Sequence, residues 1–325
     1  MEKGIIRLIV DPQYGDSGKG KIGTIYSYID KAKQCLEYGT GHSAGHQVNL
    51  SDSESYLTSA IPPVYVNPNC RLVLDKRMCV NENLFFSELE KLKKFNVKNR
   101  IFIDSRCTKL KGDEREKAYE GEYETVANSP RFAPFLADSD EMIQECIDRG
   151  ENQVVVVQHG KLLTKGYGEG EVIPYPLSLN EALDRFDKWQ DRLRIVYVLK
   201  MMPTRTYDGP LENEIEWPSE IPRAYGLHTK RPHRIAGKIS DDVLADIRSL
   251  NKNAEIALTF ADYFDPEIKD KKDGLTVKLL REIHRIEEAT GIPVNCISTG
   301  KLVTDFTVGK KYRNKDSQYR GVNND

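Results

Sequence analysis

A strand-like run, a glycine-rich turn and a helix follow one another at the start of the chain, and this succession most restricts the fold. Residues 4–10 are apolar and largely β-branched over the length of one strand. The turn that follows contains Gly15 and Gly18, and residues 19–33 carry apolar side chains at helical spacing. A strand that leads through a glycine-rich turn into a helix is typical of the opening of an α/β domain.

The same alternation continues along the 325 residues. Further strand-like runs lie at 71–74, 100–104, 153–157, 193–201, 254–259 and 292–297, and helical patterns at 83–95 and 275–290. The continuous apolar run at 153–157 is typical of a strand buried on both faces of a parallel sheet. We therefore expect one α/β domain over 1–310, with a mainly parallel central sheet, flanking helices and long functional loops at 109–124 and 207–223, and a polar tail over 311–325.

Composition excludes several classes of protein. Lys and Arg total 48 against 50 Asp and Glu, a formal charge of -2, and no basic stripe alternates with aromatic residues, which argues against a nucleic-acid partner. No apolar run reaches the roughly 18 residues of a membrane span, and the N-terminus has no signal-peptide pattern. The six cysteines are scattered without a CxxC pair, as in reduced cytoplasmic proteins. We expect a cytoplasmic protein with neither a membrane nor a nucleic-acid partner.

The glycine-rich segment 15–21, Gly-Asp-Ser-Gly-Lys-Gly-Lys, is suited to phosphate binding. Backbone N–H groups at a helix N-terminus attract phosphate oxygens, and Lys19 and Lys21 add positive charge. The spacing is not that of a Walker A loop. Asp16 would repel phosphate unless it binds Mg²⁺ or acts as a base. A tight turn with solvated lysines is the alternative for this segment alone.

A second glycine-rich segment, 39–46, ends in His46. A lone histidine is more often structural than catalytic. Beside a phosphate loop, His46 becomes a candidate acid or phosphate ligand.

These segments resemble the adenylosuccinate synthetase family. Residues 15–21, GDSGKGK, resemble its GDEGKGK motif, and 41–46, GHSAGH, resemble its GHNAGH motif. Residues 203–210, 225–234, 259–262 and 291–300 are similar, in the same order, to TRVGxGP, (F/Y)GxxTGRRRR, TKxD and TGVPV…ISTGP. The resemblance spans nearly the whole chain and implies the P-loop-NTPase-like fold of that family.

The resemblance implies a ligase that couples nucleoside-triphosphate hydrolysis to joining L-aspartate to C6 of a 6-oxopurine nucleotide, through a 6-phosphoryl intermediate. By motif position Asp16 is the base and a Mg²⁺ ligand, and His46 is the acid. Lys19 is the cation beside the transferring phosphoryl group. The carbonyl of Gly45 is the second Mg²⁺ contact.

The resemblance also assigns binding residues to three groups. The nucleotide contacts are Gly15, Ser17, Gly18, Gly20, Lys21, Gly45, Gln47, Asp262, Ser298 and Gly300. The acceptor contacts are Ser43, Ser129, His159 and Arg205. Thr229, Arg231 and Arg234 are the residues expected to bind the aspartate carboxylates, since guanidinium groups bind carboxylates in a bidentate way.

The departures from the family pattern concentrate in the acceptor pocket. Ser17 stands where the family has Glu, and Ser43 where it has Asn; in the element that recognises the donor base, Phe260 stands where the family has the Lys of TKxD. The GTTGxGxGP element is absent. Smaller side chains at positions 17 and 43 either leave room for an exocyclic 2-amino group or replace a ribose contact. We therefore expect dGMP as the acceptor, as in short phage relatives that make the 2-amino-adenine precursor, with IMP or another acceptor as the alternative.

Other properties stay open at this stage. The donor is GTP, ATP or dATP, because the Lys of TKxD is missing. The family habit implies a homodimer with an arginine crossing into the neighbouring site, for which Arg131 is the nearest candidate. If the chain is phage-encoded, its compartment is the host cytoplasm. A non-catalytic nucleotide-binding homologue is the competing class.

Overall fold

The computed structural model describes residues 4–39, 44–112, 114, 123–173, 179–226, 230–249, 253–271 and 274–309. Ser43, Thr229 and the expected tail at 311–325 lie outside the described residues. The division into one domain and a tail stays a prediction.

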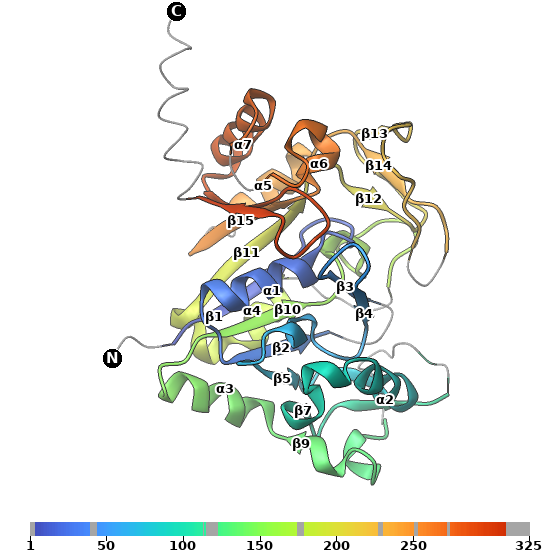
Figure 1. The fold of residues 1–325 in the computed structure, drawn as a ribbon, viewed down its shortest axis with the longest axis vertical. Coiled ribbons are helices and arrows are strands. Elements are labelled where there is room, and N and C mark those ends of the chain that lie inside the picture. The colour runs from blue at the N-terminus through green and yellow to red at the C-terminus, as the bar shows by residue number, and fades with distance from the viewer. Residues whose placement is uncertain are drawn as a thin grey trace, which may run out of the picture.

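A ten-stranded sheet forms the centre of the described structure, in the order β17-β16-β15-β11-β1-β10-β2-β5-β7-β9 (Figure 1). All neighbouring strands are parallel except β16 and β17. The expected mainly parallel sheet is therefore confirmed. Its strands in chain order are β1 (Ile6–Val10), β2 (Gln34–Tyr38), β5 (Arg71–Leu74), β7 (Ile101–Asp104), β9 (Leu136–Ala137), β10 (Gln153–Val157), β11 (Leu193–Lys200), β15 (Ala254–Thr259), β16 (Val294–Ser298) and β17 (Phe306–Val308).

Helices cover both faces of this sheet (Figure 1). On one face lie α1 (Lys19–Ile29) and α2 (Glu82–Lys91). On the other face lie α3 (Ser139–Asp148), α4 (Leu179–Arg185), α5 (Asp241–Ser249) and α7 (Val277–Thr290). A single-turn helix, α6 (Ala261–Phe264), follows β15.

The valines of β10 show why the sheet needs two helical layers. Val155 and Val157 belong to the apolar core beneath α3, α4, α5 and α7. Val154 and Val156 belong to the core beneath α1 and α2. Because successive side chains of a strand point to opposite faces, an uninterrupted apolar run must be buried on both sides.

Smaller sheets carry the loops around the carboxyl ends of the central strands. The hairpin of β3 (His46–Asn49) and β4 (Ser55–Thr58) begins at His46. The others are the pair β6 (Cys79–Asn81) and β8 (Thr108–Leu110), and the sheet of β12 (Thr204–Arg205), β14 (Arg234–Ala236) and β13 (Glu214–Ile215).

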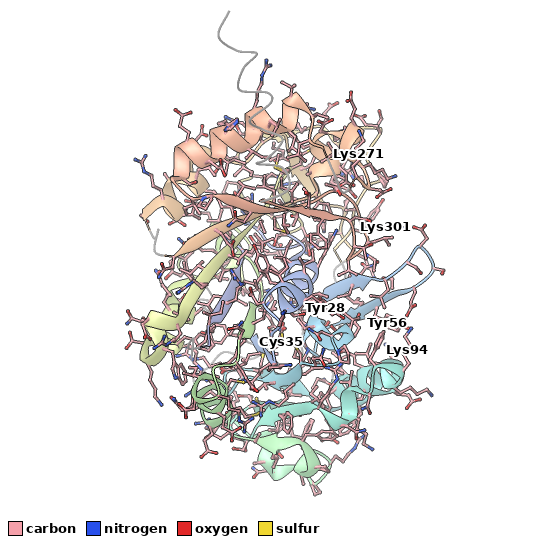
Figure 2. All side chains as sticks on the ribbon, turned by 60° about the vertical axis from the view of Figure 1, so that its left-hand side comes forward. Tyr28, Cys35, Tyr56, Lys94, Lys271 and Lys301 are labelled. Carbon is pink, nitrogen blue, oxygen red and sulfur yellow. The ribbon has the colours of Figure 1, made fainter. Side chains whose placement is uncertain are left out.

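Two lysines hold the β3–β4 hairpin from opposite sides, as Figure 2 shows for Lys301 and Lys94 on either side of Tyr56. The Lys301 ammonium lies 2.6 Å from a carboxylate oxygen of Asp52 at the hairpin tip. The Lys94 ammonium lies 5.1 Å from the centre of the Tyr56 ring. Both contacts lie on the hairpin whose first residue is His46.

Strand positions were predicted better than helix ends. The strands expected at 71–74, 153–157 and 254–259 agree with β5, β10 and β15 residue for residue. The helix expected over 19–33 ends at Ile29, because the chain turns through Lys31, whose φ is 51°. The long loop at 207–223 contains the short strand β13, paired with β14.

Two expectations from composition can be compared with the described residues. All six cysteines are buried thiols. No helix among the described residues has both the length and the apolar character that crossing a membrane requires.

Glu88 of α2 clamps the loop that leaves the hairpin. Its buried carboxylate accepts backbone N–H groups of Ser59, Ala60 and Ile61 at 2.7, 3.0 and 3.0 Å. Burial raises the pKa of Glu88 to about 7, although the three N–H donors oppose the shift. The clamp sets the path into the 3₁₀ turn Pro63–Val66, which packs against α1.

We expect Glu88→Ala to lower the free energy of unfolding by about 3 kcal/mol, because three buried N–H groups lose their acceptor. Urea unfolding followed by circular dichroism measures this. Glu90→Ala on the same helix is the matched control; its pair with Lys93 is exposed, so a change within about 0.5 kcal/mol is expected. Equal stability of the Glu88 variant and the wild type would contradict the clamp.

The same clamp predicts a pH dependence. Because the pKa of Glu88 is raised from 4.5 to about 7, its stabilising contribution is complete below pH 4.5 and is lost as the pH rises through about 7. Relative to Glu88→Gln, the wild type should therefore lose stability across this window.

Candidate active site

The phosphate loop, residues 11–18, connects the carboxyl end of β1 to the N-terminus of α1. Gly15, Asp16 and Gly18 have φ values of 80°, 49° and 79°, in the left-handed region. Glycine adopts this region at no steric cost, whereas Asp16 does so under local strain. The loop lies at the edge of the parallel sheet where ligand sites of α/β folds gather.

Buried hydrogen bonds hold the loop in place. The Gln13 side chain accepts the N–H of Lys200 at 2.7 Å and donates to its carbonyl at 3.2 Å. The Asp11 carboxylate accepts the N–H of Gln13 at 2.6 Å. On the other side, the Thr259 hydroxyl donates to the carbonyl of Ser17 at 2.7 Å. The loop is thereby fixed to the ends of β11 and β15.

A cavity of about 340 Å³ opens beside the phosphate loop. The hairpin start, the ends of β11 and β15, residues 224–226, His233 and the segment around 298–301 contribute to its wall. Most residues predicted to bind nucleotide or to act in catalysis line it, namely Gly15, Asp16, Ser17, Gly18, Lys19, Gly20, Lys21, Gly45, His46, Gln47, His159, Ser298 and Gly300. The structure brings them together; their roles stay predictions.

Asp16 is the acidic group of this cavity. Its side chain is 40% exposed, and its carboxylate lies 3.2 Å from Nε2 of His233. Burial alone would raise the pKa of Asp16, but His233 and the ammonium groups of Lys200 and Lys19 outweigh it and lower that pKa. Asp16 is therefore a carboxylate near neutral pH, and its negative charge can bind a cation.

Lys19 and Lys21 differ in what their ammonium groups contact. Lys19 lies 3.4 Å from a carboxylate oxygen of Asp11. Lys21 donates to the Ser298 hydroxyl and to the carbonyls of Gly300 and Asp305 at 2.8, 2.9 and 2.8 Å. All three protons of Lys21 are thus used to tie α1 to the loop after β16. Lys19 is the better placed of the two to compensate phosphate charge.

His46 is buried at the start of β3, with Nε2 2.8 Å from a carboxylate oxygen of Glu37 on β2. A Cβ on Gly20 would come within 2.8 Å of the Cβ of His46, so α1 packs directly on this histidine. A carboxylate bonded to one ring nitrogen fixes the orientation of an imidazole. The sequence did not point to Glu37.

Lys200 and Phe260 also line the cavity without having been predicted as site residues. The Lys200 ammonium lies 4.2 Å from the centre of the Phe260 ring and donates to the Thr204 hydroxyl at 2.6 Å. Burial lowers the pKa of Lys200 to about 8, against the opposing influence of Asp16 and Asp11. The signal for Lys200 was its place at the end of an expected strand, where α/β sites gather.

Two residues predicted to contact the acceptor nucleotide do not line the cavity. Arg205 is buried, and its guanidinium donates to backbone carbonyls that include those of Pro210 and Asp208, at 2.7 and 3.0 Å. Ser129 donates to Glu82 at 2.8 Å. Neither residue is among the described residues that line the cavity. The contacts of Arg205 shape the loop at 207–210 instead.

Arg231 and Arg234, two of the predicted aspartate contacts, are not among the described residues of the cavity wall. Arg231 is half-exposed and lies 2.6 Å from a carboxylate oxygen of Glu171. Arg234 donates to the carbonyl of Gly209 at 2.6 Å. Binding aspartate through these guanidinium groups would require the Glu171 pair to open.

Asp262, a predicted nucleotide contact, is also absent from the described cavity wall. Burial raises its pKa, with Lys21 opposing. Arg131, named as an arginine that crosses between subunits, here lies 2.8 Å from Glu82 of its own chain and 4.0 Å from the centre of the Phe86 ring.

Comparison with known proteins gives relatives over nearly the full length. Residues 8–111 match the sequence profile of the family described as adenylosuccinate synthetase. The adenylosuccinate synthetase of Methanocaldococcus jannaschii is 30% identical over 329 residues, which cover 90% of this chain and 93% of that protein. That of Methanococcus aeolicus is 29% identical over 327 residues, covering 90% of this chain and 96% of that protein.

Two solved structures share the fold. Fully ligated adenylosuccinate synthetase from Plasmodium falciparum superimposes with a TM-score of 0.76 at 15% identity, over 94% of this chain and 100% of that one. Cyanophage S-2L succinoaminodeoxyadenylate synthetase (PurZ), bound to dGMP and to dATP as an energy donor, superimposes with a TM-score of 0.74 at 16% identity, over 98% of this chain and 100% of that one.

Because Lys19 and Lys21 make different contacts, we expect their substitution to have different effects. Lys21→Met should lower the free energy of unfolding by about 2 kcal/mol, because three buried acceptors lose their donor. Lys19→Met should cost less in stability but weaken nucleoside-triphosphate binding about tenfold. Urea unfolding and calorimetric titration with ATP and GTP measure the two effects. A Lys21 variant as stable as the wild type would contradict its assignment as a structural tie.

Proposed function

The chain belongs to the adenylosuccinate synthetase family. We propose that it joins L-aspartate to C6 of a purine nucleotide, and that this nucleotide is dGMP. Membership makes it a nucleotide-binding, C–N bond-forming ligase. The observation that carries the proposal is the meeting of Asp16, Lys19 and His46 on one cavity wall. A drifted binding protein would have no need of this combination of base, cation and acid.

The first step proposed is phosphorylation of the acceptor. Asp16 takes the N1 proton of the purine, and O6 attacks the γ-phosphorus of the donor. The O6–P bond forms as the bond from Pγ to the bridging oxygen breaks, with its electron pair leaving on the diphosphate. Lys19 offsets the charge on the transferring group, and His46 supplies a proton on the leaving side.

The second step is substitution at C6. The aspartate amine attacks C6, the C6–O6 bond breaks, and O6 leaves as part of inorganic phosphate. Phosphorylation makes this step feasible because phosphate is a far better leaving group than an oxo oxygen. Thr229, Arg231 and Arg234 are the residues proposed to hold the aspartate carboxylates.

The residues present fit a magnesium ion. The described residues contain no group of three or more His, Cys, Asp or Glu side chains suited to a metal. Mg²⁺ commonly takes only one or two protein carboxylates and completes its shell with phosphates and water. Asp16, half-exposed and ionised, together with the Gly45 carbonyl, would hold it, and bound Mg²⁺ would neutralise charge on the donor phosphates.

Ser17 supports dGMP as the acceptor. It lies on the cavity wall where the family carries a glutamate. Its hydroxyl is buried and has no hydrogen-bond partner among the described residues. A small side chain with an unused hydroxyl suits an exocyclic 2-amino group, which a glutamate would exclude by volume. The structural neighbour from cyanophage S-2L has dGMP bound.

Phe260 supports a donor site that takes adenine as well as guanine. Its ring lies on the cavity wall, 5.1 Å from the ring of Tyr263. Aromatic rings stack on any base and discriminate little between purines. We propose ATP or dATP as donors beside GTP. We also propose that the protein is a homodimer, as the family resemblance implies.

Incubation of the protein with aspartate and Mg²⁺, each of IMP, dIMP, GMP and dGMP, and each of GTP, ATP and dATP, tests the proposal by mass spectrometry. We expect the succinyl adduct of dGMP to form fastest, at least tenfold above IMP. An adduct with IMP alone would make the protein an adenylosuccinate synthetase in the strict sense. Absence of any adduct would favour a non-catalytic homologue.

Ser17→Glu restores the family residue and serves as the paired variant. We expect it to lower the ratio of dGMP to IMP turnover at least tenfold, because the added carboxylate fills the space given to the 2-amino group. An unchanged ratio would remove Ser17 from the account of acceptor choice.

A further inference from the structure

Lys200 carries a buried positive charge that the described protein only partly satisfies. The side chain is 3% exposed and lines the cavity. Among the described residues, the Thr204 hydroxyl is the one hydrogen-bond acceptor given to its ammonium. An ammonium has three protons to donate, and a buried cation is costly unless an anion faces it. Asp16 and Asp11 act on this charge electrostatically, and two of its three protons have no acceptor among the described residues, which leaves them for an anionic ligand in the cavity.

The position of Lys200 is rigid. Its backbone N–H and carbonyl both bond to the Gln13 side chain of the phosphate loop. The ammonium of Lys200 lies 4.2 Å from the centre of the Phe260 ring. Through Gln13 the backbone of Lys200 is tied to the phosphate loop, and its buried ammonium lies between the Thr204 hydroxyl and the ring of Phe260.

Two further lysines beside the phosphate loop line the cavity, and their contacts differ from those of Lys200. Lys21 has its protons on Ser298, Gly300 and Asp305. Lys19 faces Asp11 at the beginning of the loop. Lys200 acts electrostatically on Asp16, the base proposed to take the N1 proton of the acceptor nucleotide.

We propose that Lys200 is a further catalytic residue, whose ammonium binds non-bridging oxygens of the phosphoryl group while that group moves from the donor to O6 and then leaves as phosphate. This inference rests on the proposed function. In the first step the O6–P bond forms and the donor Pγ–O bond breaks; in the second the N–C6 bond forms and the C6–O6 bond breaks. Lys200 gains and loses no covalent bond in either step, and its charge offsets the charge that a phosphoryl group brings beside the Asp16 carboxylate.

Lys200→Met tests the inference, because methionine keeps the length of the side chain and removes its charge. We expect kcat to fall about 100-fold or more, as when a group that stabilises transition-state charge is lost, with KM for nucleotides and aspartate within threefold. Exchange of ¹⁸O from the β,γ-bridge of the donor into non-bridging positions, measured without aspartate, isolates the first step and should fall in parallel. Unchanged exchange would overturn the proposal.

Inorganic phosphate is a probe that does not depend on turnover. Calorimetric titration should show phosphate binding weakened at least tenfold in Lys200→Met. Lys161→Met is the matched control, because Lys161 bonds to Asp246 and is not among the described residues of the cavity wall. Thermal unfolding of both variants verifies that they are folded.

Adduct formation and phosphate binding distinguish a failure of the proposed function from a failure of the inference about Lys200. A wild type that forms no adduct would contradict the proposed function, and the phosphate titration would then still decide whether Lys200 forms an anion site. Equal phosphate affinity of Lys200→Met and the wild type would overturn the inference whatever the activity. A loss that appears in the Lys161 variant too would likewise overturn it.

Discussion

The pair of hydrogen bonds between the Gln13 side chain and the backbone of Lys200 fixes the part of the molecule on which the site depends. It joins the phosphate loop to the end of β11 inside the protein, at 2.7 and 3.2 Å. Through this joint the left-handed turns at Gly15 and Asp16 are held against the sheet. The places of the Asp16 carboxylate and of the Lys200 ammonium are therefore set together, before any substrate arrives, which is how a preorganised site lowers a barrier.

The buried charges of the cavity divide into structural and functional ones. Lys21 is satisfied by neutral oxygens of Ser298, Gly300 and Asp305, so it supports the fold whether or not nucleotide is bound. Lys19 and Lys200 face the cavity beside acidic groups and keep capacity for an anion. A site arranged in this way favours substrates that carry negative charge at the position of the transferring phosphoryl group.

Much of this arrangement follows from the sequence, for reasons that differ between elements. The run at 153–157 predicted its strand because a doubly buried strand has no polar positions. Residues 15–21 predicted the loop because its glycines and lysines are contiguous. Glu37 and Lys200 were missed for different reasons. Glu37 lies inside a buried strand, where the sequence gives no sign that its carboxylate meets His46 nine residues later, and Lys200 acts on Asp16, which lies far from it in sequence. Arg205 occupies the motif position of a ligand contact, yet its guanidinium N–H groups donate to backbone carbonyls of the loop that follows. The sequence could not predict these bonds, because they depend on the path that this loop takes.

The proposed mechanism requires that the oxygen at C6 of the acceptor nucleotide is phosphorylated before aspartate displaces that oxygen. Labelling that oxygen with ¹⁸O in dGMP and analysing the phosphate released on reaction with aspartate and ATP tests this most directly. The account predicts one ¹⁸O atom in each inorganic phosphate released with the succinyl adduct. Phosphate free of the label, with ¹⁸O recovered in water or retained in the nucleotide, would contradict it.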